Sequence, residues 1–389
     1  MSQSSNLAIN PHHQAIVSGG GESKSRSVHQ YSLDLLRIIA IILVVFLHLL
    51  PQPISKSFTN DVTIVWQIID IIIGTTTKIC VPLFVIISGY LMIDRDYEQP
   101  RKLHRFFNHN YLPMFVSFEL WTIFSFIVVK PFTRVSFSGL ISTAFFIGNP
   151  FMVHFWFMHM MLGLYLLIPA VSTTLRHLNY RYAVGLMLVF IVFSSALPTA
   201  VLSAHWFGIN LPKSIGNGDL YGFNGSIGLW LVLFVFGYWC RNAEILSKVA
   251  LHIRSCYLIV SAIVLYLFTY PEYHLSHTTN QIQASFLPVA LLSMTVFWTV
   301  LGLEQFLRRR SSTLKTILRT SAPYAYGVYM THLLVSTITH SDTVLRVLSF
   351  IPHARILFGN PLTVLLLSFC LCWLLGRITV VRTWLLLIK

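Results

Sequence analysis

SLDLLRIIAIILVVFLHLLP, residues 32–51, is an apolar stretch long enough for a membrane helix, yet it contains an acid, a base and a histidine. Arg37 and His48 are eleven residues apart, and eleven helical steps of about 100° come to about three whole turns. Their side chains therefore share one face, roughly 16 Å apart along the axis, with Asp34 one turn before Arg37. Because charge inside a membrane is costly, we expect this face to line a protein interior or a wet cavity.

A structural alternative exists for the same residues. Asp34 and Arg37 could form an ion pair at the membrane edge, with the long arginine side chain snorkelling to the interface, while His48 caps the outer end of the helix. The spacing alone leaves this alternative open.

The composition predicts a membrane protein. Hydrophobic residues make up 55% of the 389 residues and charged residues only 10%, a balance that a water-soluble globule does not have. The net charge of +14 does not indicate a nucleic-acid partner here, because the lysines and arginines of membrane proteins gather in cytoplasmic loops. The five cysteines show neither a disulfide framework nor a metal-ligand spacing, so we expect them to be packing residues.

Windows of about 20 apolar residues predict an all-α fold, a polytopic membrane bundle of about ten transmembrane helices surrounded by membrane lipids. The second window is too long for one straight crossing and contains Gly74 and Pro82, so we expect a bend or a partly interfacial first half. Residues 1–30 are polar and rich in Gly and Ser, which predicts a disordered tail before a membrane domain over 31–389. The windows lie near 33–50, 64–92, 111–130, 152–171, 182–202, 222–240, 251–269, 284–306, 321–339 and 361–381.

The positive charges predict the orientation. The tail, the C-terminus and every second loop hold 18 of the 27 lysines and arginines, whereas the intervening loops hold six. Positively charged loops remain in the cytoplasm, so both termini are predicted to be cytoplasmic, which requires an even number of helices. Arg37 then lies near the cytoplasmic face and His48 toward the outer face.

Several polar residues outside the first helix are candidates for a site. Arg101, Lys102 and Arg105 form a basic run after the second window, which suits phosphate groups or is ordinary flanking charge. Five further residues are candidates for a substrate cavity, although each could equally form a structural hydrogen bond within the bundle or, for the tryptophan, belong to an interfacial belt. They are Glu119, His154, Trp156, Tyr329 and His332. His154 and His159 do not share a helical face, so no metal site is expected.

The stretch LDLLRIIAIILVVFLH resembles the first-helix signature of acyltransferase family 3, the integral-membrane O-acyltransferases of bacterial surface glycans, including the type that acetylates the enterobacterial common antigen. The similarity continues in chain order over residues 32 to about 382. It includes VPLFVIISGYLM, the basic run, HFWFMHMMLGLYLLIP, LVLFVFGYW and YAYGVYMTHLLV.

The resemblance implies transfer of an acyl group, usually acetyl from cytosolic acetyl-CoA, to a hydroxyl of a glycan or of its lipid-linked precursor beyond the bacterial inner membrane. Acetyl-CoA would be a substrate, and no permanently bound cofactor is expected. The resemblance makes Arg37 and His48 the essential pair and the basic run the contact for the CoA phosphates. The family's basic pair is commonly Arg-x-x-Arg, whereas this chain has Lys102-x-x-Arg105 with Arg101 beside it.

The chemistry of the residues agrees with that implication. His48 can accept the proton of a sugar hydroxyl as it attacks a thioester. Arg37 keeps its proton, so it can supply only charge and hydrogen bonds, to the CoA arm or to the oxyanion, and Asp34 would orient it. The alternative from another class is an exporter of glycans or lipid-linked sugars. Exporters tend to show repeated halves with paired broken helices, and only the second window is broken here.

Overall fold

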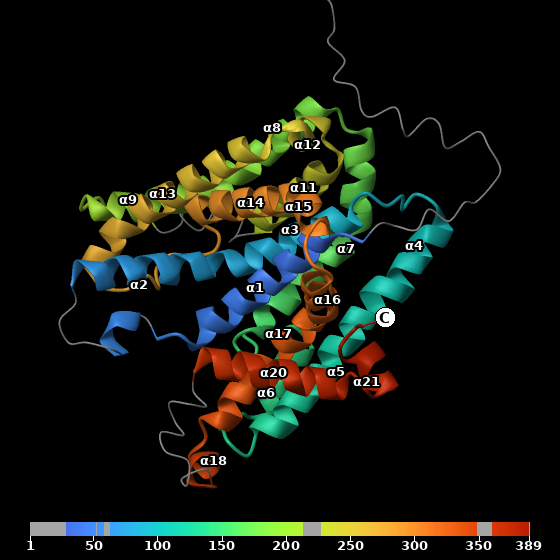
Figure 1. Ribbon diagram of the computed structural model, residues 1–389, viewed down its shortest axis with the longest axis vertical. Helices are drawn as coiled ribbons and strands as arrows, with labels where there is room; N and C mark the ends of the chain where they lie inside the picture. The colour runs from blue at the N-terminus through green and yellow to red at the C-terminus, as the bar shows by residue number, and fades with distance from the viewer. Residues whose placement is uncertain (1–28, 52, 58–62, 213–226, 348–359, 389) are drawn as a thin grey trace, which may run out of the picture.

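The computed structural model of the protein describes residues 29–51, 53–57, 63–212, 227–347 and 360–388. These residues form helices and loops, without a strand among them (Figure 1). The described part of the chain is therefore all-helical, as the apolar windows predict.

The helices follow the predicted windows closely. The first helix, α1, covers Tyr31–Leu49. The others are α2 (Ile64–Thr76), α3 (Cys80–Met92), α4 (Pro100–Phe106), α5 (Leu112–Val129), α6 (Phe137–Ala144), α7 (Phe155–His177), α8 (Tyr180–Ile191), α9 (Leu197–Trp206), α11 (Ile227–Asn242), α12 (Glu244–Lys248), α13 (Leu251–Ser276), α14 (Leu287–Gly302), α15 (Glu304–Arg308), α16 (Ser312–Ser321), α17 (Ala325–Thr339), α18 (Asp342–Val347), α20 (Pro361–Leu375) and α21 (Thr379–Trp384).

Six helical stretches are long and apolar enough to cross a membrane. They are Tyr31–Leu49, Ile64–Met92, Pro100–Val129, Phe155–His177, Tyr180–Trp206 and Leu251–Ser276. Three shorter apolar helices, α11, α14 and α20, match further windows, and α17 occupies the window at 321–339. The chain is thus a multi-pass membrane protein, while the number of ten crossings stays a prediction. Residues 1–28 of the predicted tail lie outside the described residues.

The long second window contains an interruption where its sequence is unfavourable for a regular helix. A 3₁₀ turn over Thr77–Ile79 separates α2 from α3. Before it, the Thr75 hydroxyl donates to the carbonyl of Ile71 at 2.6 Å, and after it Pro82 lacks the N–H of a regular helix. Both features disturb the helical hydrogen-bond ladder, so the interruption follows from the local sequence.

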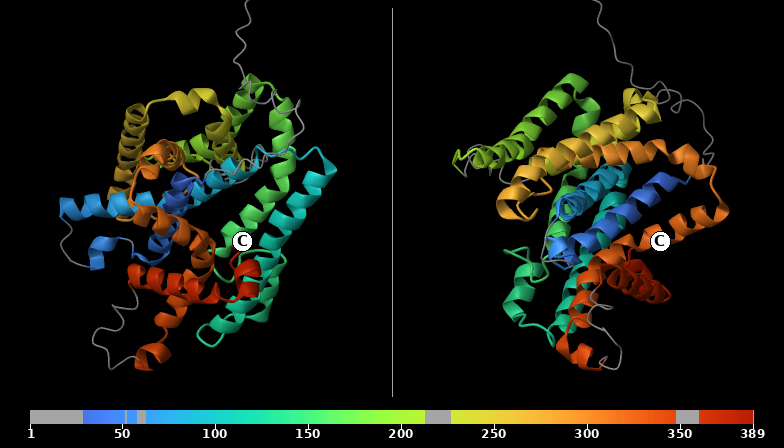
Figure 2. Two further views of the ribbon diagram at one scale, coloured as in Figure 1. Left: turned by 45° about the vertical axis from the view of Figure 1, so that its right-hand side comes forward. Right: turned by 60° about the vertical axis from the view of Figure 1, so that its left-hand side comes forward.

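Helix α1 lies in the middle of the bundle. It contacts α3, α14, α16, α17 and α20, and Figure 2 shows it flanked by α3 and by the orange C-terminal helices. Its buried residues include Leu36, Ala40 and Val44, which follow one another at four-residue spacing on one stripe. Helix α1 is therefore largely surrounded by protein.

Helices α3 and α11 approach each other backbone to backbone at two glycines. A Cβ atom on Gly89 would lie 1.9 Å from the carbonyl oxygen of Phe234, and one on Gly237 would lie 2.2 Å from that of Ile86. Small residues allow such approaches between membrane helices. The segments that contain these glycines, SGY at 88–90 and FGY at 236–238, thus have a packing role in this fold.

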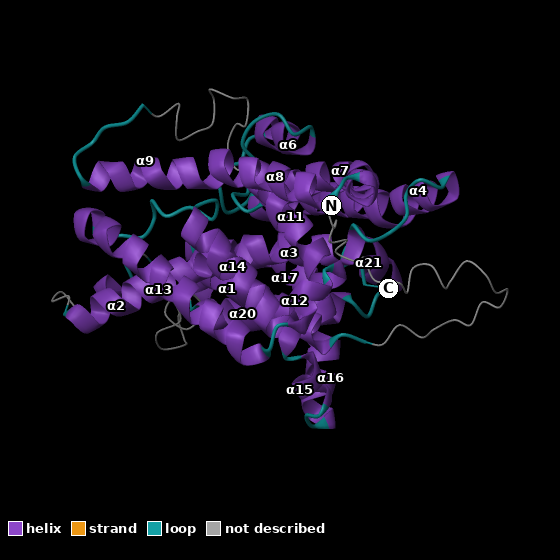
Figure 3. Cartoon of the chain, turned by 90° about the horizontal axis from the view of Figure 1, so that it is seen from above, coloured by secondary structure: helices purple, strands orange, loops and turns teal. Residues whose placement is uncertain are grey.

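Loops rich in Lys and Arg are tied together at one end of the bundle. Asp94 accepts bonds from Arg241 at 3.3 Å and, through its carbonyl, from Arg176 at 2.9 Å. Arg308 of α15 donates to the carbonyl of His29 at 2.6 Å. Helices α15 and α16 project from one side of the bundle in Figure 3. The loops predicted to be cytoplasmic therefore meet one another, and their assignment to the cytoplasm stays a prediction.

Candidate active site

Three histidines from distant parts of the chain form one cluster. His48 comes from α1, His154 precedes α7, and His332 comes from α17. The His332 ring lies 5.4 Å from the ring of His48 and 5.0 Å from that of His154, centroid to centroid, and the rings of His48 and His154 are 6.5 Å apart. His154 and His332 are buried, and His48 is partly buried. The fold thus assembles three of the histidines that the sequence singled out.

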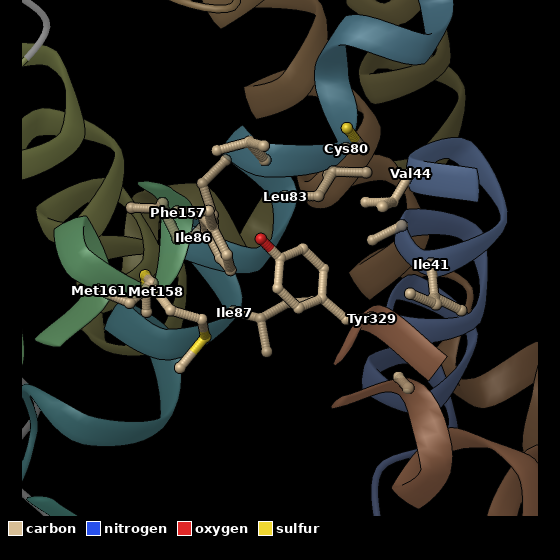
Figure 4. Close-up of a cluster of buried hydrophobic side chains, with 14 of the residues drawn as sticks. Ile41, Val44, Cys80, Leu83, Ile86, Ile87, Phe157, Met158, Met161 and Tyr329 are labelled. Carbon is tan, nitrogen blue, oxygen red and sulfur yellow. The ribbon is translucent and has the colours of Figure 1, made fainter. Parts of the chain in front are cut away.

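Tyr329 closes the inner side of this cluster. Its hydroxyl donates a hydrogen bond to the carbonyl of His154, and its ring lies 5.4 Å from the ring of His154 and 5.9 Å from that of His332. Figure 4 shows the phenol ring among apolar side chains of α1, α3 and α7, including Ile41 and Phe157. On this side the cluster is bordered mainly by apolar side chains, which strengthens the interactions of its polar groups with one another.

The hydrogen bond of His332 determines which of its ring nitrogens is free. Nδ1 lies 2.7 Å from the carbonyl oxygen of Tyr329, and a carbonyl only accepts, so in the neutral imidazole Nδ1 carries the proton. Nε2 is buried and has no hydrogen-bond partner within the described ranges. His332 can therefore accept a proton or a hydrogen bond from His48 through Nε2.

A cavity of about 670 Å³, the inner cavity, reaches from Arg37 to Tyr329. Its walls are mostly apolar and come from α3, α5, α7 and α17. On one side it is closed by residues 383, 384 and 386–388, of which Leu386 is buried against α17 at Gly327. The inner cavity therefore joins the predicted cytoplasmic end of α1 to the histidine cluster.

Arg37 is oriented by the acid one turn before it. Its guanidinium donates to Oδ1 of Asp34 at 3.0 Å, and Oδ2 of Asp34 lies 2.5 Å from Nε2 of His29. The Asp34 side chain is only 5% exposed, whereas that of Arg37 is 32% exposed and lines the inner cavity. Asp34 thus holds Arg37 toward the N-terminal end of α1, with further N–H donors left for a ligand.

The basic run lies beside the mouth of the inner cavity. Arg101, Lys102 and Arg105 are exposed on α4, and the cavity lining begins one turn later, at residues 108–110. Lys102 pairs with Asp96 at 2.9 Å, and this hydrogen bond lowers the pKa of the Asp96 carboxyl. Arg101 and Arg105 have no ion-pair partner in the described part of the chain.

A second cavity of about 300 Å³, the outer cavity, lies near the histidine cluster and shares no lining residue with the inner cavity. It is lined by Leu47, Lys78, Val81, Trp156, Trp230, Asn280 and residues 282–285. Leu47 is the neighbour of His48, and Trp156 follows His154 by two residues. The histidine cluster therefore adjoins both cavities, through Tyr329 on the inner one and through chain neighbours of His48 and His154 on the outer one.

Sequence reasoning missed several residues of the outer cavity. Trp230 lies inside an apolar window, where nothing distinguishes it from a core residue. Asn280 and Gln283 belong to a polar run between two windows, a signal that could have been used. Lys78, a lysine inside the long second window, is a further signal of this kind.

Glu119 lies on α5, which contributes Pro113 and Met114 to the inner cavity. It is half-buried in α5 and lines neither the inner nor the outer cavity. One of its carboxylate oxygens is buried without a partner among the residues that the structure describes. The same residues contain no group of three or more His, Cys, Asp or Glu side chains that could hold a metal ion.

The comparison with known families agrees with the resemblance seen in the sequence. The model of acyltransferase family 3, described as an acyltransferase domain, matches residues 30–377, which include α1 through α20 and with them the histidine cluster and the outer cavity. No curated protein and no solved structure matches the chain. A match over this much of the chain, together with its membrane helices, means that the protein belongs to acyltransferase family 3 and is a membrane acyltransferase.

Proposed function

We propose that the protein transfers an acetyl group from cytosolic acetyl-CoA to a hydroxyl of a cell-surface glycan, or of its lipid-linked precursor, across the bacterial inner membrane. One observation carries this proposal: the histidine cluster adjoins two separate cavities, and the inner one reaches the basic end of the bundle. Donor and acceptor can then approach His48 from different cavities.

The inner cavity suits the pantetheine arm of CoA. Its volume of about 670 Å³ falls within the range of ~300–1,000 Å³ typical of ligand pockets. Arg37 and Tyr329 line its two ends, and the roughly 16 Å between Arg37 and His48 along α1 is close to the length of that arm. The CoA phosphates would then lie near Arg101 and Arg105, which are exposed beside the mouth.

The reaction needs a base at the acceptor hydroxyl, and His48 supplies it. The hydroxyl gives its proton to His48 while its oxygen forms the new C–O bond with the thioester carbonyl carbon. The C–S bond then breaks, and the CoA thiolate takes the proton from His48. His332, through its free Nε2, can accept a hydrogen bond from His48 and so keep the other nitrogen of His48 directed at the acceptor.

The geometry favours one of the two roles expected for Arg37. Its guanidinium is held by Asp34, which lies one turn further from His48. A carbonyl that reacts at His48 lies about three turns away from Arg37, so we expect the arginine to bind the CoA arm rather than the oxyanion.

The test is a comparison of His48→Ala and Arg37→Lys with wild type in cells that express each at equal membrane abundance. His48→Ala should reduce the ester-linked acyl content of surface glycan roughly 10²–10⁴-fold, the usual contribution of a general base, and glycan export should continue. His252→Ala, which changes an exposed histidine of α13, serves as the matched control. Loss of export with esters retained on the remaining glycan would instead support the exporter alternative.

A further inference from the structure

Lys78 is a cation without a counter-ion inside a membrane helix. It lies in the 3₁₀ turn between α2 and α3 and lines the outer cavity. None of the ion pairs found within the described ranges includes it. A charge in this position is costly, so an intramembrane lysine that lines a cavity is a candidate for binding a ligand.

The nearest acid along the same helix cannot serve as its partner. Asp70 is fully buried and accepts three hydrogen bonds: from the backbone N–H of Ser55 at 2.9 Å, from the Ser55 hydroxyl at 2.6 Å and from the Tyr273 hydroxyl at 2.6 Å. These donors occupy both carboxylate oxygens. Among the described residues, Lys78 is thus left without an acidic partner and can bind the negative charge of a ligand.

Two tryptophans form an aromatic wall of the same cavity. The rings of Trp156 and Trp230 lie 6.4 Å apart, centroid to centroid, at an interplanar angle of 42°. Trp230 is buried, and Trp156 is 39% exposed. The faces of such rings carry partial negative charge, so they pack well on the C–H groups of a sugar ring.

The remaining wall supplies hydrogen-bonding groups on a fixed loop. The side-chain amides of Asn280 and Gln283 are exposed and make no hydrogen bond in the described part of the chain. The loop is held in place because Ser195 donates to the carbonyl of Ser285 at 2.8 Å and the N–H of Leu287 donates to Thr199 at 2.9 Å. Amides can both donate to and accept from sugar hydroxyls.

We propose that the outer cavity binds an anionic sugar, with its negative group on Lys78, its ring against the two tryptophans and its hydroxyls at Asn280 and Gln283. This inference rests on the proposed function, for which the cavity would be the acceptor subsite beside His48. A volume of about 300 Å³ is at the lower end of ligand pockets and suits a single sugar unit. The anion is either the carboxylate of a uronic acid within the glycan or the phosphate that joins a sugar to its carrier.

Binding to the purified full-length protein tests this inference without any acyl transfer. The probes are methyl glucuronide, glucose 1-phosphate and the neutral methyl glucoside, and the readout is tryptophan fluorescence. At least one anionic probe should bind with a Kd at least tenfold below that of the glucoside, and added salt should reduce the difference. Binding of the glucuronide alone would identify a carboxylate in the glycan, and binding of the phosphate alone would identify a carrier-linked sugar.

Variants show whether the named residues are responsible. Lys78→Gln should abolish the preference for the anion, and Lys78→Arg should keep it. Trp230→Phe should remove most of the fluorescence change, whereas Trp239→Phe, on the same helix but outside the cavity, should not. Equal binding of neutral and anionic probes by wild type, no saturable binding of any probe, or an unchanged preference in Lys78→Gln would each overturn the inference.

A separate assay of acetyl transfer from acetyl-CoA distinguishes the two proposals. If the anionic probes bind but acetyl-CoA yields no ester on any glycan, the subsite stands and the proposed function fails. If esters form on glycan while Lys78→Gln leaves both binding and transfer unchanged, the proposed function stands and the anionic subsite fails.

Discussion

Gly89→Ala tests whether the close approach of α3 and α11 positions the two cavities. The new Cβ would lie 1.9 Å from the carbonyl oxygen of Phe234 and 2.7 Å from its carbonyl carbon, and ordinary contact begins at 3.4 Å. These are backbone atoms, so no side chain can rotate away. The helices must move apart by about 1.5 Å, and overpacking of this kind typically costs ~1–3 kcal/mol.

The displacement should affect activity as well as stability. Helix α3 contributes Phe84 and Ile87 to the inner cavity, and α11 contributes Trp230 to the outer cavity. Gly89→Ala should therefore lower both the thermal midpoint of the purified protein in detergent and its acyl transfer per molecule. Gly163→Ala on α7 is the matched control, because a Cβ there has no atom within 4 Å and alanine favours the helix. A thermal midpoint of Gly89→Ala equal to that of wild type would refute the reasoning.

Two further substitutions follow from the geometry. Replacing Arg101, Lys102 and Arg105 with glutamine should raise the Kd of acetyl-CoA roughly tenfold, since exposed charge contacts contribute up to ~1 kcal/mol each. The same change at the exposed Arg309, Arg310 and Arg319 should leave that Kd unchanged, and equal affinity of both triple variants in a titration would exclude the basic run from the site. Tyr273→Phe should destabilise the protein by about 1–3 kcal/mol, because it removes one of three donors to the buried Asp70. Tyr270→Phe, an exposed change on the same helix, should have no effect on the unfolding midpoint, and similar midpoints for the two variants would contradict a structural role of the Asp70 network.

The sequence predicts those features that depend on local spacing. The helical windows and the shared face of Arg37 and His48 follow from the period of an α-helix, which holds wherever the helix packs. The interruption of the second window likewise follows from its threonines and from Pro82. Such features can be read without knowledge of the neighbouring helices.

Contacts between distant helices could not be derived in this way. From the sequence, His154, His332 and Glu119 are equally good candidates for a substrate cavity. Hydropathy does not report which side of a helix faces a cavity, so it cannot rank them. The fold brings the two histidines to His48, and Glu119 lines neither cavity. The partner of Lys78 could not be derived from the sequence either. Asp70 is the nearest acid on the same helix, and only the structure shows that it is bonded to Ser55 and Tyr273 instead.

The placement of single residues on α7 and α3 bears on how donor and acceptor can meet. Trp156 lines the outer cavity and its neighbour Phe157 the inner one, since adjacent residues of a helix point about 100° apart. On α3, Val81 lines the outer cavity, and Phe84, about one turn later, lines the inner one. The two cavities are therefore lined by different side chains of the same two helices, and the layer of protein between them adjoins the histidine cluster. Under the proposed function, the thioester reaches His48 from one cavity and the acceptor hydroxyl reaches it from the other. The acyl group then passes from CoA to the sugar, and neither molecule has to cross the layer. An exporter would have to move a whole sugar through this layer, past Tyr329 and its apolar surroundings, which is why the arrangement favours transfer of the acyl group over transport of the glycan.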